Sequence, residues 1–204
     1  MLEKSLAILF ALLILATLIN RFLVWRLPER KGDEVTLRIR TWWGIVICFS
    51  MVISGPRWMT LTFFALISFL ALKEYCTLIS VHFPRWLYWG IPLNYLLIGF
   101  NCFELFLLFI PLAGFLILAT WRVLVGDPSG FLHTVSAIFC GWIMTVFTLS
   151  HAAWLLMLPT INIQGGALLV LFLLALTESN DIAQYLWGKS CGRRKVVPKV
   201  SPGK

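Results

Sequence analysis

The stretch TWWGIVICFSMVISGPRWMTLTFFALISFLAL, Thr41 to Leu72, decides the fold because Arg57 is its only charged residue. Gly55 and Pro56 divide it, since proline lacks the amide hydrogen that a helix needs and glycine commonly ends helices. A membrane-spanning helix takes roughly 20 apolar residues. The stretch therefore predicts two short helices, Trp42–Ser54 and Trp58–Leu72, and the first is short enough for a re-entrant segment.

The composition of the whole chain indicates the same solvent. Hydrophobic residues make up 60% of the 204 residues and charged residues only 13%, whereas soluble domains are nearer half apolar and a quarter charged. The five cysteines are odd in number, and neither they nor the three histidines have the spacing of zinc ligands. The chain is expected to lie in a bilayer, without a disulfide framework or a zinc site.

The remaining apolar segments complete a count of seven helices. Ser5–Trp25 predicts a retained transmembrane helix, and Trp86–Trp121 is long enough for two helices with a turn near Asn101 and Glu104. Phe131–Leu158 predicts a further long helix, and the last begins at Ala167. We expect an all-α, polytopic integral membrane protein with about seven transmembrane helices, forming a single membrane domain over residues 1–204.

The distribution of cations supports an odd number of crossings. With the amino terminus outside, 14 of the 17 lysines and arginines fall on the inner side, and only Lys4 and Arg57 fall on the outer side. Cytoplasmic loops carry such an excess of positive charge. Losing one crossing would mix the two groups, so we expect the carboxyl terminus to lie in the cytoplasm.

The tail NDIAQYLWGKSCGRRKVVPKVSPGK, Asn180 to Lys204, has two interpretations. A basic run after a last helix commonly anchors the protein by touching anionic lipid. Glycines and a terminal SPGK instead suit a cytoplasmic phosphate-binding motif, because glycine lets backbone amides approach a phosphate and lysine adds charge. Pro198 stands where a Walker A loop needs glycine, so that loop is excluded.

The segment TESND precedes this tail and carries the acids. Glu178, Asp181 and Tyr185 follow each other at spacings that share one helical face. An acid within a membrane segment suggests a functional site. The alternative is that the helix ends at Leu176 and these residues are simply hydrated. If the helix continues, Asp181 is expected to face the cationic tail or a metal ion.

The tail resembles the seventh helix and following loop of the phosphatidate cytidylyltransferase (CDP-diacylglycerol synthase) family. TWWG at Thr41 and LKEY at Leu72 resemble the early part of that family, and DIAQY is similar to an enterobacterial branch of it. The ungapped pattern D-x-x-x-Y-x-x-G-x-x-x-G-x-x-K-x-x-P-x-x-S-P-x-K falls on Asp181, Tyr185, Gly188, Gly192, Lys195, Pro198, Ser201, Pro202 and Lys204.

The resemblance implies that phosphatidate and CTP are converted to CDP-diacylglycerol and pyrophosphate, with Mg²⁺ as cofactor. It further implies that Ser201 and Lys204 hold the CTP phosphates, that Lys195 adds positive potential, and that Asp181, the candidate catalytic residue, orients a cation or a lysine. It also implies a homodimer in the bacterial inner membrane. No nucleic-acid partner is expected.

The chain departs from that family at several points. Gly203 stands where many members carry a second lysine, and Gln184 stands where alanine is usual. The family signatures T-x-E-G, K-R-x-x-x-x-K-D and H-G-G-x-x-D-R-x-D do not occur in the 204 residues, so we expect this chain alone to be inactive. A family-derived scaffold without chemistry is therefore the main alternative. A small transporter would show an internal repeat and polar residues in mid-helix, for which Asn94 is the nearest and isolated candidate.

Overall fold

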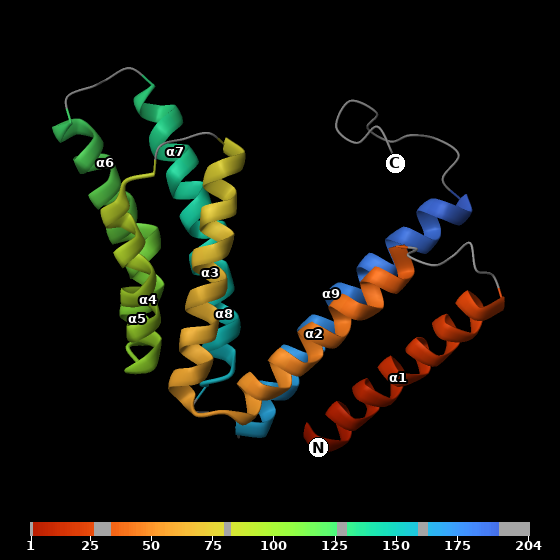
Figure 1. Ribbon diagram of the computed structural model, residues 1–204. Helices are drawn as coiled ribbons and strands as arrows, with labels where there is room; N and C mark the ends of the chain where they lie inside the picture. The colour runs from red at the N-terminus through yellow and green to blue at the C-terminus, as the bar shows by residue number, and fades with distance from the viewer. Residues whose placement is uncertain (1, 27–33, 80–82, 126–129, 159–162, 192–204) are drawn as a thin grey trace.

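The computed structural model describes residues 2–26, 34–79, 83–125, 130–158 and 163–191, and these parts of the chain form helices without any strand. The helices run back and forth, so that the first residues of α1 and the last residues of α9 lie at opposite ends of the molecule (Figure 1). The elements are α1 (Leu2–Arg26), α2 (Glu34–Ser54), α3 (Arg57–Ile79), η2 (Arg85–Trp89), α4 (Gly90–Gly99), α5 (Phe103–Leu108), η3 (Phe109–Gly114), α6 (Phe115–Leu124), α7 (Phe131–Trp142), η4 (Ile143–Phe147), α8 (Thr148–Leu155) and α9 (Ile163–Cys191).

The expected all-α polytopic membrane protein is confirmed. Six helices of the described chain are long and apolar enough to cross a membrane, and the short η2–α4 segment lies among them. The long candidates are Glu3–Arg26, Val35–Ser54, Arg57–Ile79, Phe103–Leu124, Phe131–Leu155 and Gly165–Gln184.

Two helix boundaries differ from the sequence-based expectation by more than four residues. The helix predicted to start at Trp42 starts at Glu34, and the one predicted to end at Leu72 continues to Ile79. Helix formation is cooperative and satisfies every backbone group within the segment, so polar flanks are drawn into a helix once its apolar part has formed. The segment at Trp42 is therefore long enough to span, and the short segment of the fold is α4 instead.

The turn between α4 and α5 lies where the sequence predicts it. Asn101 adopts a left-handed conformation with φ of 59°, which asparagine tolerates better than most residues. Arg57 at the start of α3 reaches this turn, donating hydrogen bonds to the carbonyl of Ile98 at 2.9 Å and to the Asn101 side chain at 2.6 Å. Glu104 lies within the first turn of α5.

Two long helices each contain a π-helical turn. In the first, α5–η3–α6, Pro111 has no amide hydrogen to donate, which explains the local change of helix type. In the second, α7–η4–α8, no proline is present, and the Thr148 hydroxyl donates to the Ile143 carbonyl at 2.9 Å. Such side-chain hydrogen bonds satisfy carbonyls that a π turn displaces within a membrane.

The elements from α3 to α8 form a unit that we call the bundle, and the core lies within it. Its centre is fully buried and aromatic contacts cross it, such as the Phe106 ring 5.6 Å from Phe147 and 5.0 Å from His151. The largest completely buried apolar side chains belong to these elements: Leu72, Leu87, Ile98, Phe106, Ile110, Leu118, Ile138 and Val146. The bundle thus has a continuous interior of its own.

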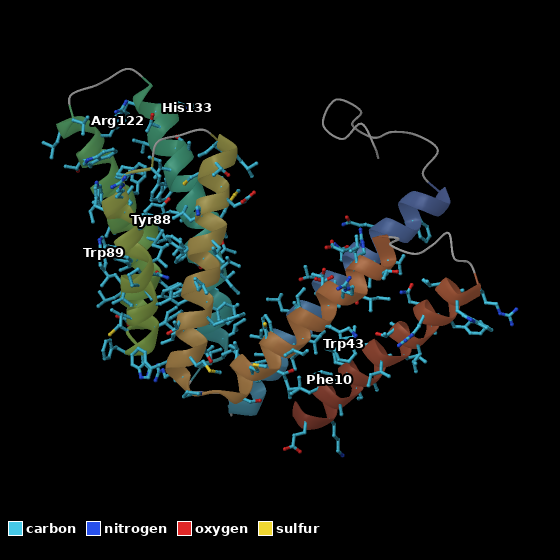
Figure 2. All side chains as sticks on the ribbon, viewed as in Figure 1. Phe10, Trp43, Tyr88, Trp89, Arg122 and His133 are labelled. Atoms are coloured by element: carbon cyan, nitrogen blue, oxygen red, sulfur yellow. The ribbon has the colours of Figure 1, made fainter. Side chains whose placement is uncertain are left out.

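Helices α1, α2 and α9 form a second unit, which we call the arm, and it diverges from the bundle toward the end where α9 finishes (Figure 1). Figure 2 shows Phe10 of α1 beside Trp43 of α2, with ring centroids 6.1 Å apart. The Trp43 indole donates to Thr17 at 3.0 Å, and Asn20 donates to Thr36 at 3.1 Å. Polar contacts between side chains therefore hold α1 to α2.

Candidate functional site

The acidic segment of the sequence lies within a continuous helix. α9 runs unbroken from Ile163 to Cys191 and therefore passes through Glu178 and Asp181. The alternative that the helix ends at Leu176 is wrong. No proline or glycine occurs between Gly166 and Gly188, so nothing in that stretch interrupts the hydrogen-bonding ladder.

The acids share one face of α9, as their spacing predicts. Glu178 is half-buried and Asp181, three residues later, is exposed. Thr177 does not add a free hydroxyl, because it donates to the carbonyl of Leu173 at 2.8 Å. The Tyr185 side chain lies outside the described side chains. The described part of this face consequently presents two carboxylates that accept hydrogen bonds or bind cations.

A cation from another helix accompanies these acids. Arg38 of α2 attracts the Glu178 carboxylate electrostatically, while Asp181 repels it. α2 and α9 run in opposite directions, so a residue near the start of α2 lies at the depth of residues late in α9 (Figure 1). Ionisable groups in a membrane segment are stabilised when they are paired. The site thus combines both ends of the described chain.

Sequence reasoning missed the role of Arg38. It counted Arg38 only as one of the 14 inner cations because it expected the second helix to begin at Trp42. A signal was present, since Arg38 lies 16 residues before Ser54 and Glu178 lies 15 residues after Ile163, measured from the adjoining ends of two antiparallel helices. If the second helix is extended to Glu34, Arg38 and Glu178 fall at similar depths in the two antiparallel helices.

The predicted phosphate-binding residues Lys195, Ser201 and Lys204 lie outside the described residues, as does Gly192. Gly188 belongs to α9, and no described residue lies within 4 Å of where its Cβ would be. Gly188 lies on the same helix as Asp181, two turns beyond it. The structure therefore places Glu178 and Asp181 on one face of α9, and Glu178 within electrostatic reach of Arg38, without describing the rest of the predicted site.

The carboxylates are compatible with Mg²⁺. Among the described residues, no group of three histidine, cysteine or acidic side chains is placed to hold a metal ion. Mg²⁺ in nucleotide enzymes commonly uses one or two carboxylates, with water and substrate phosphates as its other ligands. The exposed Asp181 carboxylate is a group of this type, and Glu178, one helical turn away, is the other described carboxylate on this face of α9 that could hold such an ion.

Comparison with known protein families identifies the family of the chain. The cytidylyltransferase family matches residues 36–204, which include most of α2, the whole bundle, α9 and the tail. The chain belongs to the cytidylyltransferase family. Membership supports a nucleotidyltransferase role in a membrane protein.

Comparison with individual proteins identifies a relative of the chain. The chain is 96% identical over all 204 residues to "Uncharacterized protein YnbB" of Escherichia coli (strain K12), and it spans 68% of that protein's length. No solved structure matches the chain. This similarity agrees with the enterobacterial character of the DIAQY segment.

Proposed function

We propose that this protein acts in the transfer of a cytidylyl group from CTP to phosphatidate, giving CDP-diacylglycerol for phospholipid synthesis. The observation that carries the proposal is the continuous α9 helix, which presents Asp181 on the same helix that leads into the motif of Lys195, Ser201 and Lys204. Membership of the cytidylyltransferase family supports the nucleotide class.

The proposed reaction asks for positioning and charge neutralisation. A phosphate oxygen of the lipid attacks the α-phosphorus of CTP, the new P–O bond forms, and the bond to pyrophosphate breaks. Negative charge accumulates on the transferred and leaving phosphates, so preorganised cations and hydrogen-bond donors lower the barrier. When bound, Mg²⁺ would neutralise charge on the phosphate oxygens.

Each residue of the site has a role in this proposal. Ser201 donates a hydrogen bond to a CTP phosphate, and Lys195 and Lys204 supply positive charge to the phosphates. Asp181 offers a carboxylate to the cation or to one of these lysines. The positive charge of Arg38 partly offsets the negative charge of Glu178, so the two acids of α9 repel the nucleotide less strongly than they would without Arg38.

The proposal also assigns a membrane location. The chain lies in a bacterial inner membrane with its amino terminus outside, and the end of α9 faces the cytoplasm where CTP is present. Alternating helix directions place the basic residues in the last turns of α1 and α6 on the side where α9 finishes, which supports this orientation (Figure 1). We propose a homodimer as the assembled form.

A nucleotide-binding measurement tests the proposal. The purified chain is placed in nanodiscs with Mg²⁺, and CTP affinity is compared with ATP affinity for the parent and for Asp181→Asn. We expect a preference for CTP and a loss of about tenfold or more in Asp181→Asn, because a hydrogen bond to a charged group is typically worth ~1.5–3 kcal/mol.

The matched control is Glu104→Gln, which neutralises an exposed acid at the α4–α5 turn. Its CTP affinity should equal that of the parent. If the folded parent shows no affinity for CTP, the nucleotide role is wrong and the non-catalytic scaffold takes its place. The acceptor is tested by comparing the CTP affinity in nanodiscs that contain phosphatidate with the CTP affinity in nanodiscs that contain phosphatidylglycerol. If CTP binds equally well in both, the assignment of phosphatidate as acceptor is wrong.

A further inference from the structure

Trp142 occupies a special position inside the bundle. It is only 3% exposed and lies at the end of α7, directly before the π turn η4. A Cβ at Gly90 of α4 would lie 2.6 Å from its Cζ2 atom, and a Cβ at Gly114, the last residue of η3, would lie 2.8 Å from its Cζ3 atom. Only glycine at both positions lets the indole ring lie where α4, both π turns and α7 meet.

The side chain of Asn94 lies on the same face of α4 as Gly90, one helical turn later. Asn94 is completely buried, and neither Nδ2 nor Oδ1 has a hydrogen-bond partner among the described residues. The Trp142 Nε1 atom is also without such a partner. Helical Cα–Cβ bonds tilt toward the amino terminus, which directs the Asn94 carboxamide toward Gly90. The Gly90 Cβ position lies 3.5 Å from Trp142 Cε2, the atom bonded to Nε1.

Other buried polar side chains of the bundle have partners. The hydroxyls of Ser68 and Tyr95 lie 2.7 Å apart, and Thr145 donates to the Gly141 carbonyl at 2.7 Å. A buried amide or N–H without a hydrogen bond costs about 1–3 kcal/mol, and within a bilayer no lipid tail can satisfy it. Asn94 and Trp142 both lie next to Gly90, so their three unpartnered atoms call for a common explanation.

We propose that Asn94 and Trp142 form an internal water-binding site. The Trp142 indole donates a hydrogen bond to the water oxygen, and the water donates one to Asn94 Oδ1. Its second proton and Asn94 Nδ2 remain to bond a further water or a backbone carbonyl. A buried water typically makes about three hydrogen bonds and satisfies groups that the protein leaves unpaired. This site is separate from Asp181 and does not depend on the proposed transfer reaction.

The surroundings select water as the ligand. The neighbours along the buried face of α4 are Ile91, which is 3% exposed, and Ile98, which is 1% exposed, and such apolar surroundings disfavour a charged headgroup. The two side chains that define the site carry no charge, which disfavours an ion. Two donors and one acceptor match a molecule that both accepts and donates hydrogen bonds.

The first test is a double-mutant cycle on unfolding in detergent, with Asn94→Leu, Trp142→Phe and the combined variant. If water joins the two groups, each single variant leaves a group unsatisfied, and we expect the unfolding equilibrium constant to rise about tenfold. The combined variant should then lose less than the two single losses together. Ser68→Ala, which removes the direct partner of Tyr95, gives the reference for losing a direct hydrogen bond.

The opposite result follows if the two groups are simply unsatisfied. Replacing Asn94 by leucine would then remove a buried unpaired amide, so the variant would be as stable as the parent or more stable. That outcome, or additive losses in the cycle, would overturn the proposal.

A second measurement uses the parent protein, so it does not depend on how the leucine variant folds. With ¹⁵N-labelled tryptophan, the Trp142 indole N–H signal is assigned by its loss in Trp142→Phe. We expect magnetisation transfer between this N–H and a water proton in the parent. Absence of that transfer would contradict the site directly.

Discussion

The bundle and the arm differ in how far they bury their apolar and polar side chains. The bundle places its large side chains in a shared interior, and most of its buried polar side chains hydrogen-bond to each other or to backbone carbonyls. The arm has few buried side chains, and residues such as Ile8, Phe172 and Trp187 are more than half exposed. Its charged residues Arg38, Glu178 and Asp181 instead lie toward the end where α9 finishes. The difference places the larger buried core in the bundle, and the nucleotide chemistry that we propose in the arm.

Truncating one phenylalanine in each unit should give the largest difference. Phe106→Ala removes a completely buried ring of the bundle and should cost about 3–5 kcal/mol of unfolding free energy. Phe172→Ala in α9 removes a ring that is 65% exposed, and we expect a small loss. Unfolding in a detergent series measures both. Equal losses would mean that the two units are packed alike.

Removing a tail lysine should affect nucleotide binding more than lipid binding. We expect Lys204→Gln to weaken CTP binding by about tenfold to a hundredfold, since one charged hydrogen-bonding partner is worth ~1.5–3 kcal/mol. Lipid binding should change less. Lys4→Gln, at the far end of the molecule, serves as the control. Equal loss of nucleotide and lipid binding by Lys204→Gln would show that the lysine acts as a membrane anchor.

Reversing the charge of Arg38 tests the electrostatic attraction between Arg38 and Glu178. Arg38→Glu gathers three acids, and we expect a loss of about 1 kcal/mol in stability because partly exposed pairs are worth little. Adding Glu178→Arg restores opposite charges and should recover most of that loss. A Met51→Glu variant, in the exposed lower part of α2, shows the cost of an acid without the partner. No recovery in the double variant would contradict the pairing.

The smallest effect is expected between α1 and α2. Trp43→Phe removes the hydrogen bond to Thr17 and keeps an aromatic ring next to Phe10. Hydrogen bonds between membrane helices are worth about 0.6 kcal/mol on average, so a loss near that value is expected from unfolding measurements. A loss several times larger would mean that the arm is as cooperative as the bundle.

Sequence patterns predict the class of fold and most helices, because apolar length alone indicates a spanning segment. Gly55 and Pro56 separate α2 from α3, and the turn at Asn101 separates α4 from α5, as expected. The boundaries at Glu34 and Ile79 were not predicted, since the polar residues there are decided by cooperative helix formation rather than by hydropathy.

The sequence predicted which residues of the site share a face of one helix, but not which residues approach from another helix. The spacing of Glu178 and Asp181 indicates a shared face, but it contains no information about Arg38, whose approach depends on how α2 packs in space. Asn94 was identified only as an isolated polar residue, because its relation to Trp142 depends on how that side chain packs against Gly90 and Gly114 in space. Contacts between helices are tertiary facts that a single sequence does not carry.

Photocrosslinking with an azido-CTP analogue, followed by peptide mapping, tests the central claim most directly. The account predicts that the label falls on the last turns of α9 and on the tail, within residues 178–204, and that excess CTP prevents it. Labelling confined to α3–α8, with residues 178–204 unmodified, would contradict the assignment of nucleotide binding to the arm.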